Sequence, residues 1–288
     1  MGVVVNTNIS SITASRILSE NRADLEKAME RLASGKRINS AADDAAGMAV
    51  AAKMRADIGS LNQSVRNTND AISLVNTYDG AAAEIESILI RMRELAVQTR
   101  NGTYETADRT NANFEYDALK NEITRIAGVS AFNRMTVGQG SSGAAGGTGV
   151  ADTTFTFYVG SDVAKTGNSI AFAAKALDLN LAVSSGTLNS VADTTNAASA
   201  IATLDDAITE LAANRAQAGA LINRLEHTVS NLMNVSQRLQ EAVSGIEDAD
   251  YAAESANLAR GMVLAQAGTA MLAQANQAPQ YILSLLRG

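Results

Sequence analysis

Acidic side chains gather at two points of the sequence where acid–base catalysis or cation binding would require them. Asp43 and Asp44 are adjacent, and Glu247, Asp248 and Asp250 lie together near the other end. Paired carboxylates can serve as general acids and bases, and they can hold hard cations. No pocket-forming motif accompanies either group. We therefore interpret them as helix N-caps and as first-turn charges that balance the helix dipole.

Other side chains that catalyse reactions or bind metals are almost missing. The sequence has no Cys, which excludes disulfides, thiol catalysis and Cys-ligated metals, and His227 is its only His. A zinc site needs three or four ligands, so we expect His227 on a helix surface. The Gly-rich run at 138–149 lacks the G-x-x-x-x-G-K-S/T pattern of a phosphate-binding loop. The sequence therefore predicts no cofactor and no enzymatic activity.

Two long ladders of apolar residues, spaced alternately by three and four, dominate the chain at 58–96 and 201–243. Such a ladder forms one apolar stripe along a helix, and another helix must cover it. An ordinary intramolecular bundle and an assembling subunit would both satisfy this pattern. Polar residues interrupt the ladders at Asp79, Glu86 and Arg93 in the first and at Arg215 and Ser236 in the second.

The remaining signals predict a mainly α fold, a long antiparallel rod in which N- and C-terminal helices pair in a coiled-coil-like way. Alternation of apolar residues between Phe155 and Phe172 predicts a small β-hairpin in the middle. Gly35 is expected to end the first helix, and Asn101-Gly102 to form a turn. The helices are expected at 6–33, 44–99, 106–128, 196–243 and about 247–286.

Composition narrows the class of protein further. The net charge of −7 argues against a nucleic-acid surface. No stretch of about 18 apolar residues occurs, so no membrane insertion is expected. The N-terminus lacks the basic start and long apolar run of a cleavable secretory signal, which predicts a cytoplasmic protein or export by another route.

Several long blocks, in order, closely resemble bacterial flagellins. They are ERLASGKRINSAADDAAGMAVA at 30–51, NTNDAISLVNTYDGAAAEI at 67–85, RMRELAVQT at 91–99, and the segment 244–288 almost throughout. The resemblance covers about 1–137 and 196–288. Ala71 stands where the family usually has Gly, Gly288 follows the usual terminal Arg, and the central region is short.

The resemblance implies a structural subunit that is exported through the flagellar type III apparatus and polymerises into the flagellar filament, transmitting motor torque for motility. It implies secretion to an extracellular filament, with a self-polymer, an export chaperone, and cap and hook-junction proteins as partners. O-linked glycans on the middle region are plausible. The expected domains are a terminal filament-core domain at 1–43 and 247–288, a helical rod at 44–137 and 196–246, and a variable region at 138–195.

The resemblance also implies two sets of functional residues. Arg91, Leu95 and Glu115 match the positions that bind vertebrate Toll-like receptor 5 in recognised flagellins, although surface ion pairing and subunit contacts would also explain them. The terminal segments are expected to be disordered in the free subunit and to fold on assembly. The expected assembly and chaperone seam consists of Leu18, Leu25, Leu32, Leu258, Met262, Leu272, Leu283 and Leu286.

Two alternatives stay open. A hook–filament junction protein shares the terminal design but joins filaments rather than polymerising alone. A secreted coiled-coil adhesin would not need both ends of the chain for assembly.

Overall fold

The computed structural model describes the 288-residue chain except for residues 1–6, 139–152, 161–166, 178–190, 192 and 288. The chain forms two compact units. The terminal unit comprises 1–58 and 237–288, and the central unit comprises 59–236.

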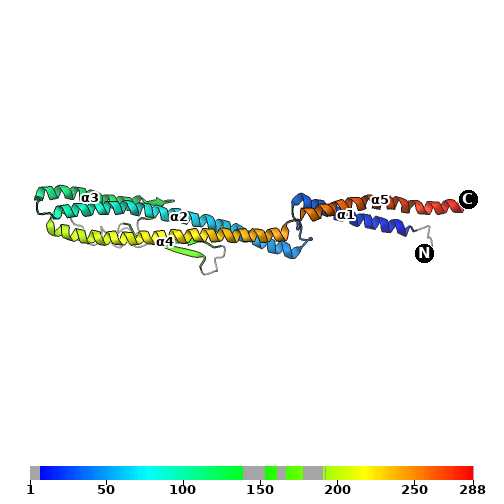
Figure 1. Cartoon of the computed structure of the whole chain (residues 1–288), viewed down its shortest axis with the longest axis horizontal. Helices are drawn as coiled ribbons and strands as arrows, with labels where there is room; N and C mark the ends of the chain where they lie inside the picture. The colour runs from blue at the N-terminus through cyan, green and yellow to red at the C-terminus, as the bar shows by residue number, and fades with distance from the viewer. Residues whose placement is uncertain (1–6, 139–152, 161–166, 178–190, 192, 288) are drawn as a thin grey trace. The chain divides into compact units, whose positions relative to one another are not determined.

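Of the described residues, 79% are helical, which confirms the prediction of a mainly α fold. Its helices begin and end within a few residues of the expected positions, and the predicted hairpin forms from the strands β3 and β4. The helices are α1 (Ile9–Ser34), α2 (Ala45–Arg100), α3 (Thr106–Val129), α4 (Thr194–Glu247) and α5 (Tyr251–Arg287), and the strands are β1 (Ala131–Phe132), β2 (Met135–Thr136), β3 (Thr153–Tyr158) and β4 (Ser169–Ala174) (Figure 1).

Local hydrogen bonds explain where three of these helices start or stop. The Asp44 carboxylate accepts from the Gly47 N–H at 2.8 Å, and the Asp250 carboxylate accepts from the Ala252 N–H at 2.9 Å. Both are N-caps, as predicted. Gly35 ends α1 with a φ of 71°, a left-handed conformation in which glycine lacks the usual steric penalty.

In the central unit, α2 and α4 run antiparallel, and each polar interruption of one ladder meets a polar residue of the other helix. Because the polar residues pair with one another, the apolar side chains between them can pack across the two helices. The contacts are Arg215 with Asp79 at 2.9 Å and with Glu86, Arg93 with Asp205 at 2.5 Å, and Ser236 with Asn62 at 3.2 Å.

These pairs specify one register of the two helices. A slip of one heptad in either direction would leave Arg215 only one of its two carboxylates, and it would also bring Arg215 beside Arg93 in one direction or Asp205 beside Glu86 in the other. Each slip therefore opposes like charges, which is unfavourable for helix pairing. The interruptions that break the apolar pattern thus select among registers that the apolar pattern alone would allow.

Helix α3 and the β3–β4 hairpin complete the core of the central unit. Helix α3 lies antiparallel to α2, and Tyr116 and Ile123 on it are fully buried. The hairpin inserts alternate residues into the same core, where Phe172 meets Tyr78 edge to face with ring centroids 5.3 Å apart. His227 is exposed on α4, as predicted. The Gly-rich run at 138–149 lies almost wholly outside the described residues.

Candidate assembly surface of the terminal helices

The terminal helices α1 and α5 pair antiparallel within the terminal unit (Figure 1). Polar contacts hold both ends of this pair. The Asn8 side-chain amide donates to the Ala275 carbonyl at 2.7 Å, and the Ser11 hydroxyl bonds the Asn276 side chain at the same distance. At the other end, the Arg31 guanidinium pairs with the Glu254 carboxylate at 3.2 Å.

Leucines of one helix fit over glycines of the other along this seam. A methyl group added at Gly268 would lie 3.2 Å from Leu18, and one added at Gly261 would lie 3.4 Å from Leu25. The two glycines are seven residues apart, as are the two leucines, so the notches recur with the heptad. The predicted seam residues Leu18, Leu25, Leu32, Leu258 and Leu272 are all buried or half-buried.

The other predicted seam residues fall elsewhere. The Met262 side chain is 49% exposed and lies off the α1–α5 contact stripe. Leu283 and Leu286 belong to α5, but their side chains lie outside the described residues. Met262 is one of a set of exposed apolar side chains on the two helices, which also contains Ile9, Ile12, Ile17, Met29, Val263, Leu264 and Met271.

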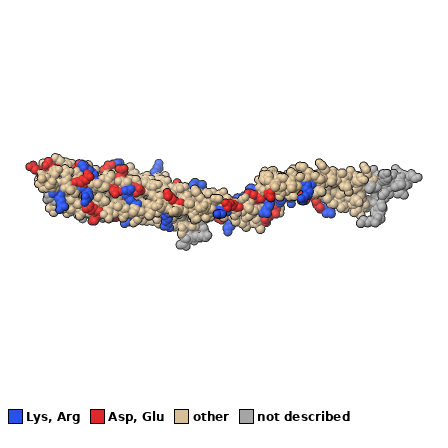
Figure 2. All heavy atoms as spheres, viewed as in Figure 1, with Lys and Arg blue, Asp and Glu red and all other residues tan. Residues whose placement is uncertain are grey.

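Charged side chains are almost absent from the outer parts of both terminal segments. Residues 1–15 and 261–286 contain no Asp, Glu, Lys, Arg or His, and Arg287 follows them. In the coloured part of the terminal unit, the stretch next to the grey atoms shows no Lys, Arg, Asp or Glu in this view (Figure 2). Charged residues are depleted from the cores of protein–protein interfaces, and exposed apolar residues of this density are unusual on a free surface.

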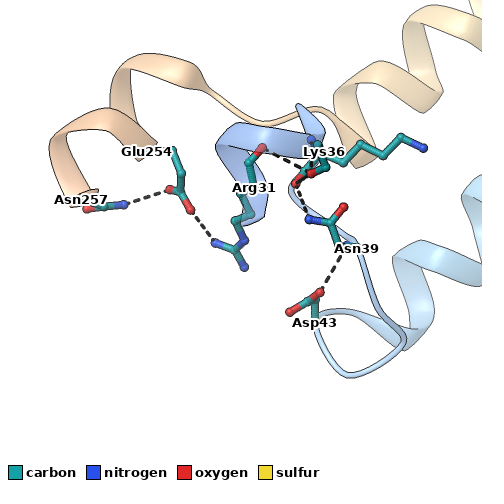
Figure 3. Close-up of polar contacts among 7 residues, drawn as sticks. Arg31, Lys36, Asn39, Asp43, Glu254 and Asn257 are labelled. Carbon is teal, nitrogen blue, oxygen red and sulfur yellow. Dashed lines mark hydrogen bonds and ion pairs between the residues drawn. The ribbon is translucent and has the colours of Figure 1, made fainter. Parts of the chain in front are cut away.

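A compact joint connects these helices to the start of α2 and the end of α4 (Figure 3). Arg37 closes the C-terminus of α4, since its N–H donates to the Glu247 carbonyl at 2.5 Å and its guanidinium to the Ile246 carbonyl at 2.7 Å. In turn the Tyr251 hydroxyl donates to the Leu32 carbonyl in the last turn of α1 at 3.1 Å. The last turns of α4 and α1 are therefore each closed in part by a residue from the other half of the chain.

The carboxylates of the joint correct part of the N-cap prediction. Glu247 lies at the C-terminal end of α4, where it is only 4% exposed and pairs with Arg55 at 3.0 Å and Lys36 at 3.7 Å. Asp248 accepts from the Ser244 hydroxyl. The N-cap interpretation was wrong for these two residues because α4 extends four residues beyond its expected end at 243.

Asp43 holds the turn that precedes α2. Its carboxylate accepts from the N–H groups of Ser40 at 2.9 Å and Asn39 at 3.2 Å, and the Ser40 backbone bond is the main reason why its pKa is lowered from 3.8. The carboxylate therefore has a structural role.

Comparison with known proteins identifies the family. The bacterial flagellin N-terminal helical region matches residues 5–142, and the bacterial flagellin C-terminal helical region matches residues 201–286. The chain belongs to the bacterial flagellin family. It is 42% identical to a flagellin of Halalkalibacterium halodurans, over 99% of this chain and 100% of that protein.

Two further relatives come from other bacteria. The chain is 38% identical to the flagellar filament 33 kDa core protein of Treponema phagedenis, over 99% of this chain and 100% of that protein. A crystal structure of Bacillus cereus flagellin is 34% identical, with a TM-score of 0.48 over 58% of this chain and 88% of that one.

The residues implied by the resemblance to receptor-binding flagellins are only partly exposed in this flagellin. Arg91 on α2 pairs with Glu115 on α3 at 2.9 Å and with Glu94 at 3.0 Å, and these bonds, Glu94 first, raise its pKa. Both Arg91 and Glu115 are about half exposed. Leu95, by contrast, is 2% exposed and belongs to the core of the central unit.

Sequence reasoning missed three features of the terminal unit: the glycine notches, the reciprocal closure of helix ends, and the burial of Glu247. The heptad spacing of Gly261 and Gly268 opposite a leucine heptad was a readable signal for the first. The other two depend on which segments meet in space. Among the described residues, no helix is long and apolar enough to cross a membrane, and no group of three or more His, Cys, Asp or Glu could hold a metal ion.

Proposed function

We propose that this chain is a structural subunit that polymerises into an extracellular flagellar filament, and that the α1–α5 pair is the part that enters the filament core. The family membership and the relative named as a flagellar filament core protein support the first statement. The near absence of charge from the outer parts of both terminal segments, 1–15 and 261–286, supports the second.

The outer faces of α1 and α5 carry this proposal. Each helix covers only one stripe of its partner, and outside that stripe the side chains of 9–15 on α1 and 261–277 on α5 are apolar or uncharged. Neighbouring subunits can cover these outer stretches without having to desolvate a charge. Charged side chains begin with the exposed Arg16–Glu20 pair on α1 and with Arg260 on α5, and they would limit how deeply the helices enter.

A thin pair of helices rich in Ala, Ser and Asn has little apolar surface to offset its ordering entropy. We infer that the terminal segments are largely disordered in the free subunit and fold on assembly. Disordered ends also suit export through a narrow channel. We propose that an export chaperone holds the C-terminal segment before export. The cap and hook-junction proteins would then contact the same seam. We also propose that the middle region, 138–195, carries O-linked sugars.

The test of polymerisation is seeded assembly viewed by electron microscopy. Purified chain with short filament seeds is expected to grow filaments of uniform width, and a variant lacking 247–288 is expected to grow none. A full chain that remains soluble with seeds would favour a hook–filament junction protein or a coiled-coil adhesin.

A second candidate function is recognition by vertebrate Toll-like receptor 5, favoured by the exposed pair of Arg91 and Glu115. The buried Leu95 would act by holding this face of α2 in place rather than by touching the receptor. Arg91→Ala is expected to weaken signalling in a receptor reporter-cell assay. Arg125→Ala is the matched control, because Arg125 also forms an exposed ion pair, with Glu122 one turn away on α3. Equal signalling by both variants would refute the assignment.

A further inference from the structure

The turn between α2 and α3 contains the one Asn-Gly step of the sequence, Asn101-Gly102. Both residues are exposed. An asparagine side-chain amide followed by glycine can react with the next backbone nitrogen, because glycine has no Cβ to obstruct the approach. Two features of this turn, and a contrast with another asparagine of the chain, bear on whether that reaction takes place here.

The first feature is the nucleophile. Among the hydrogen bonds of the described residues, the Gly102 N–H donates to none. No heavy atom outside its immediate neighbours lies within 4 Å of the place where a Cβ would stand on Gly102. The attacking nitrogen is therefore not engaged in a hydrogen bond, and the space beside the Gly102 Cα is open.

The second feature is stabilisation of the reactive form of the peptide. Removing the proton from the Gly102 nitrogen places negative charge on the Asn101 carbonyl oxygen, since the two share one peptide group. This oxygen accepts from the Arg109 guanidinium at 3.2 Å and from the Tyr104 N–H at 3.4 Å. Donors aimed at the atom where charge develops lower the barrier of such a step.

We propose that Asn101 is a site of spontaneous deamidation. The Gly102 nitrogen attacks the Asn101 side-chain carbonyl carbon, a C–N bond forms, and the bond to the side-chain nitrogen breaks. The proton from Gly102 leaves with that nitrogen as ammonia, and the product is a five-membered succinimide. Water then opens the ring at either carbonyl and gives aspartate or isoaspartate. The net charge becomes one unit more negative than −7, and the isoaspartate product adds a methylene to the backbone between α2 and α3.

The contrast lies inside the same chain. Asn39 precedes Ser40, also a step prone to this reaction, but the Ser40 N–H donates to the Asp43 carboxylate at 2.9 Å. The Asn39 side-chain amide also donates to the Lys36 carbonyl, at 3.3 Å. Nucleophile and leaving group are both held, so Asn39 is expected to stay intact in the folded protein. Asn39 is therefore an internal control at the same pH and temperature.

The experiment incubates the folded full-length chain at mildly alkaline pH and follows peptides by mass spectrometry, with an isoaspartate-specific methyltransferase as second readout. Asn101 is expected to convert first. Gly102→Ala is expected to suppress conversion, and Arg109→Ala to slow it by roughly threefold, less than a buried oxyanion site would show because the turn is open to water. Arg100→Ala is the matched control, since it removes a nearby positive charge but not the bond to Asn101.

Two results would overturn the proposal. One is conversion of Asn101 no faster than that of Asn39 in the folded chain. The other is equal slowing by Arg109→Ala and Arg100→Ala, which would assign the effect to general electrostatics. Because Arg109→Ala can also loosen the turn, the same comparison is made in urea. There the two Arg variants and the unsubstituted chain are expected to react at one rate.

Discussion

Gly268 provides a direct perturbation of the α1–α5 seam. A methyl group at this position would lie 3.2 Å from a Leu18 methyl and 3.9 Å from the Leu18 Cβ. Leu18 is 7% exposed, so it has little room to withdraw toward solvent without leaving the seam. Alanine needs a shift of a few tenths of an ångström, whereas the branched valine must displace the leucine.

The expected magnitudes follow from two opposing effects. Replacing a helical glycine by alanine stabilises a helix by about 0.5–1 kcal/mol, which offsets the small contact strain of Gly268→Ala. Gly268→Val keeps part of this gain but overpacks the seam, at about 1–3 kcal/mol. It also releases Leu18, whose full burial is worth about 1.5–3 kcal/mol. After part of the glycine gain is subtracted, the net loss is about 2–5 kcal/mol.

The assay is seeded polymerisation followed by sedimentation of the filaments. Gly268→Ala is expected to assemble as the unsubstituted chain does, and Gly268→Val to remain in the supernatant. Gly219→Val on α4 is the control, because no heavy atom lies within 4 Å of its added Cβ. Normal assembly of Gly268→Val would refute the inference that the Leu18 notch holds the terminal helices in the assembled state.

Three further predictions concern the stability of the chain, measured by thermal unfolding followed with circular dichroism. The Tyr116 hydroxyl is buried, with no hydrogen-bond partner among the described residues, so Tyr116→Phe is expected to stabilise the chain by about 1 kcal/mol. Burial raises the pKa of Tyr116 above 10.0, so the phenol ionises more readily in the unfolded chain. The free energy of unfolding is therefore unaffected by this ionisation below that pH and falls as the pH rises further, a dependence that the Phe variant should lack. Arg93→Asp is expected to lower the melting temperature by opposing Asp205, and adding Asp205→Arg should restore it; failure of the double variant to recover would count against the register argument. The pKa of Asp43 is lowered from 3.8, so its carboxylate stabilises the folded chain above that pH, and this stabilisation is lost as the pH falls below it. The melting temperature of Asp43→Asn should therefore fall less steeply with acid than that of the unsubstituted chain.

Periodicity and local chemistry account for most of the fold. The ladders predicted α2 and α4 because a 3-4 apolar stripe has few other stable solutions. Capping predictions succeeded at Gly35, Asp44 and Asp250, where the partners lie within four residues in the sequence. Alternation predicted the β3–β4 hairpin for the same reason, since period-two burial is a local property.

Predictions failed or stayed incomplete where a residue's role depends on distant partners. Glu247 was read as an N-cap, but its partners Lys36 and Arg55 are separated from it by about two-thirds of the chain. Leu95 lies in a motif that suggested an exposed epitope, yet helix packing turns it into the core. The polar interruptions of the two ladders were visible singly, but only the antiparallel register reveals that Arg215 and Arg93 meet opposite charges. Motif and spacing do not encode these pairings.

Amide hydrogen exchange on the free subunit and on the filament tests the central claim most directly. The central unit at 59–236 serves as the internal reference, because its core is complete within one chain. We expect α1 and the 251–277 part of α5 to exchange freely in the subunit and to become protected in the filament, while the reference changes little. Equal protection of α1 and α5 in the two states would contradict it, and the terminal pair would then be an ordinary intramolecular bundle.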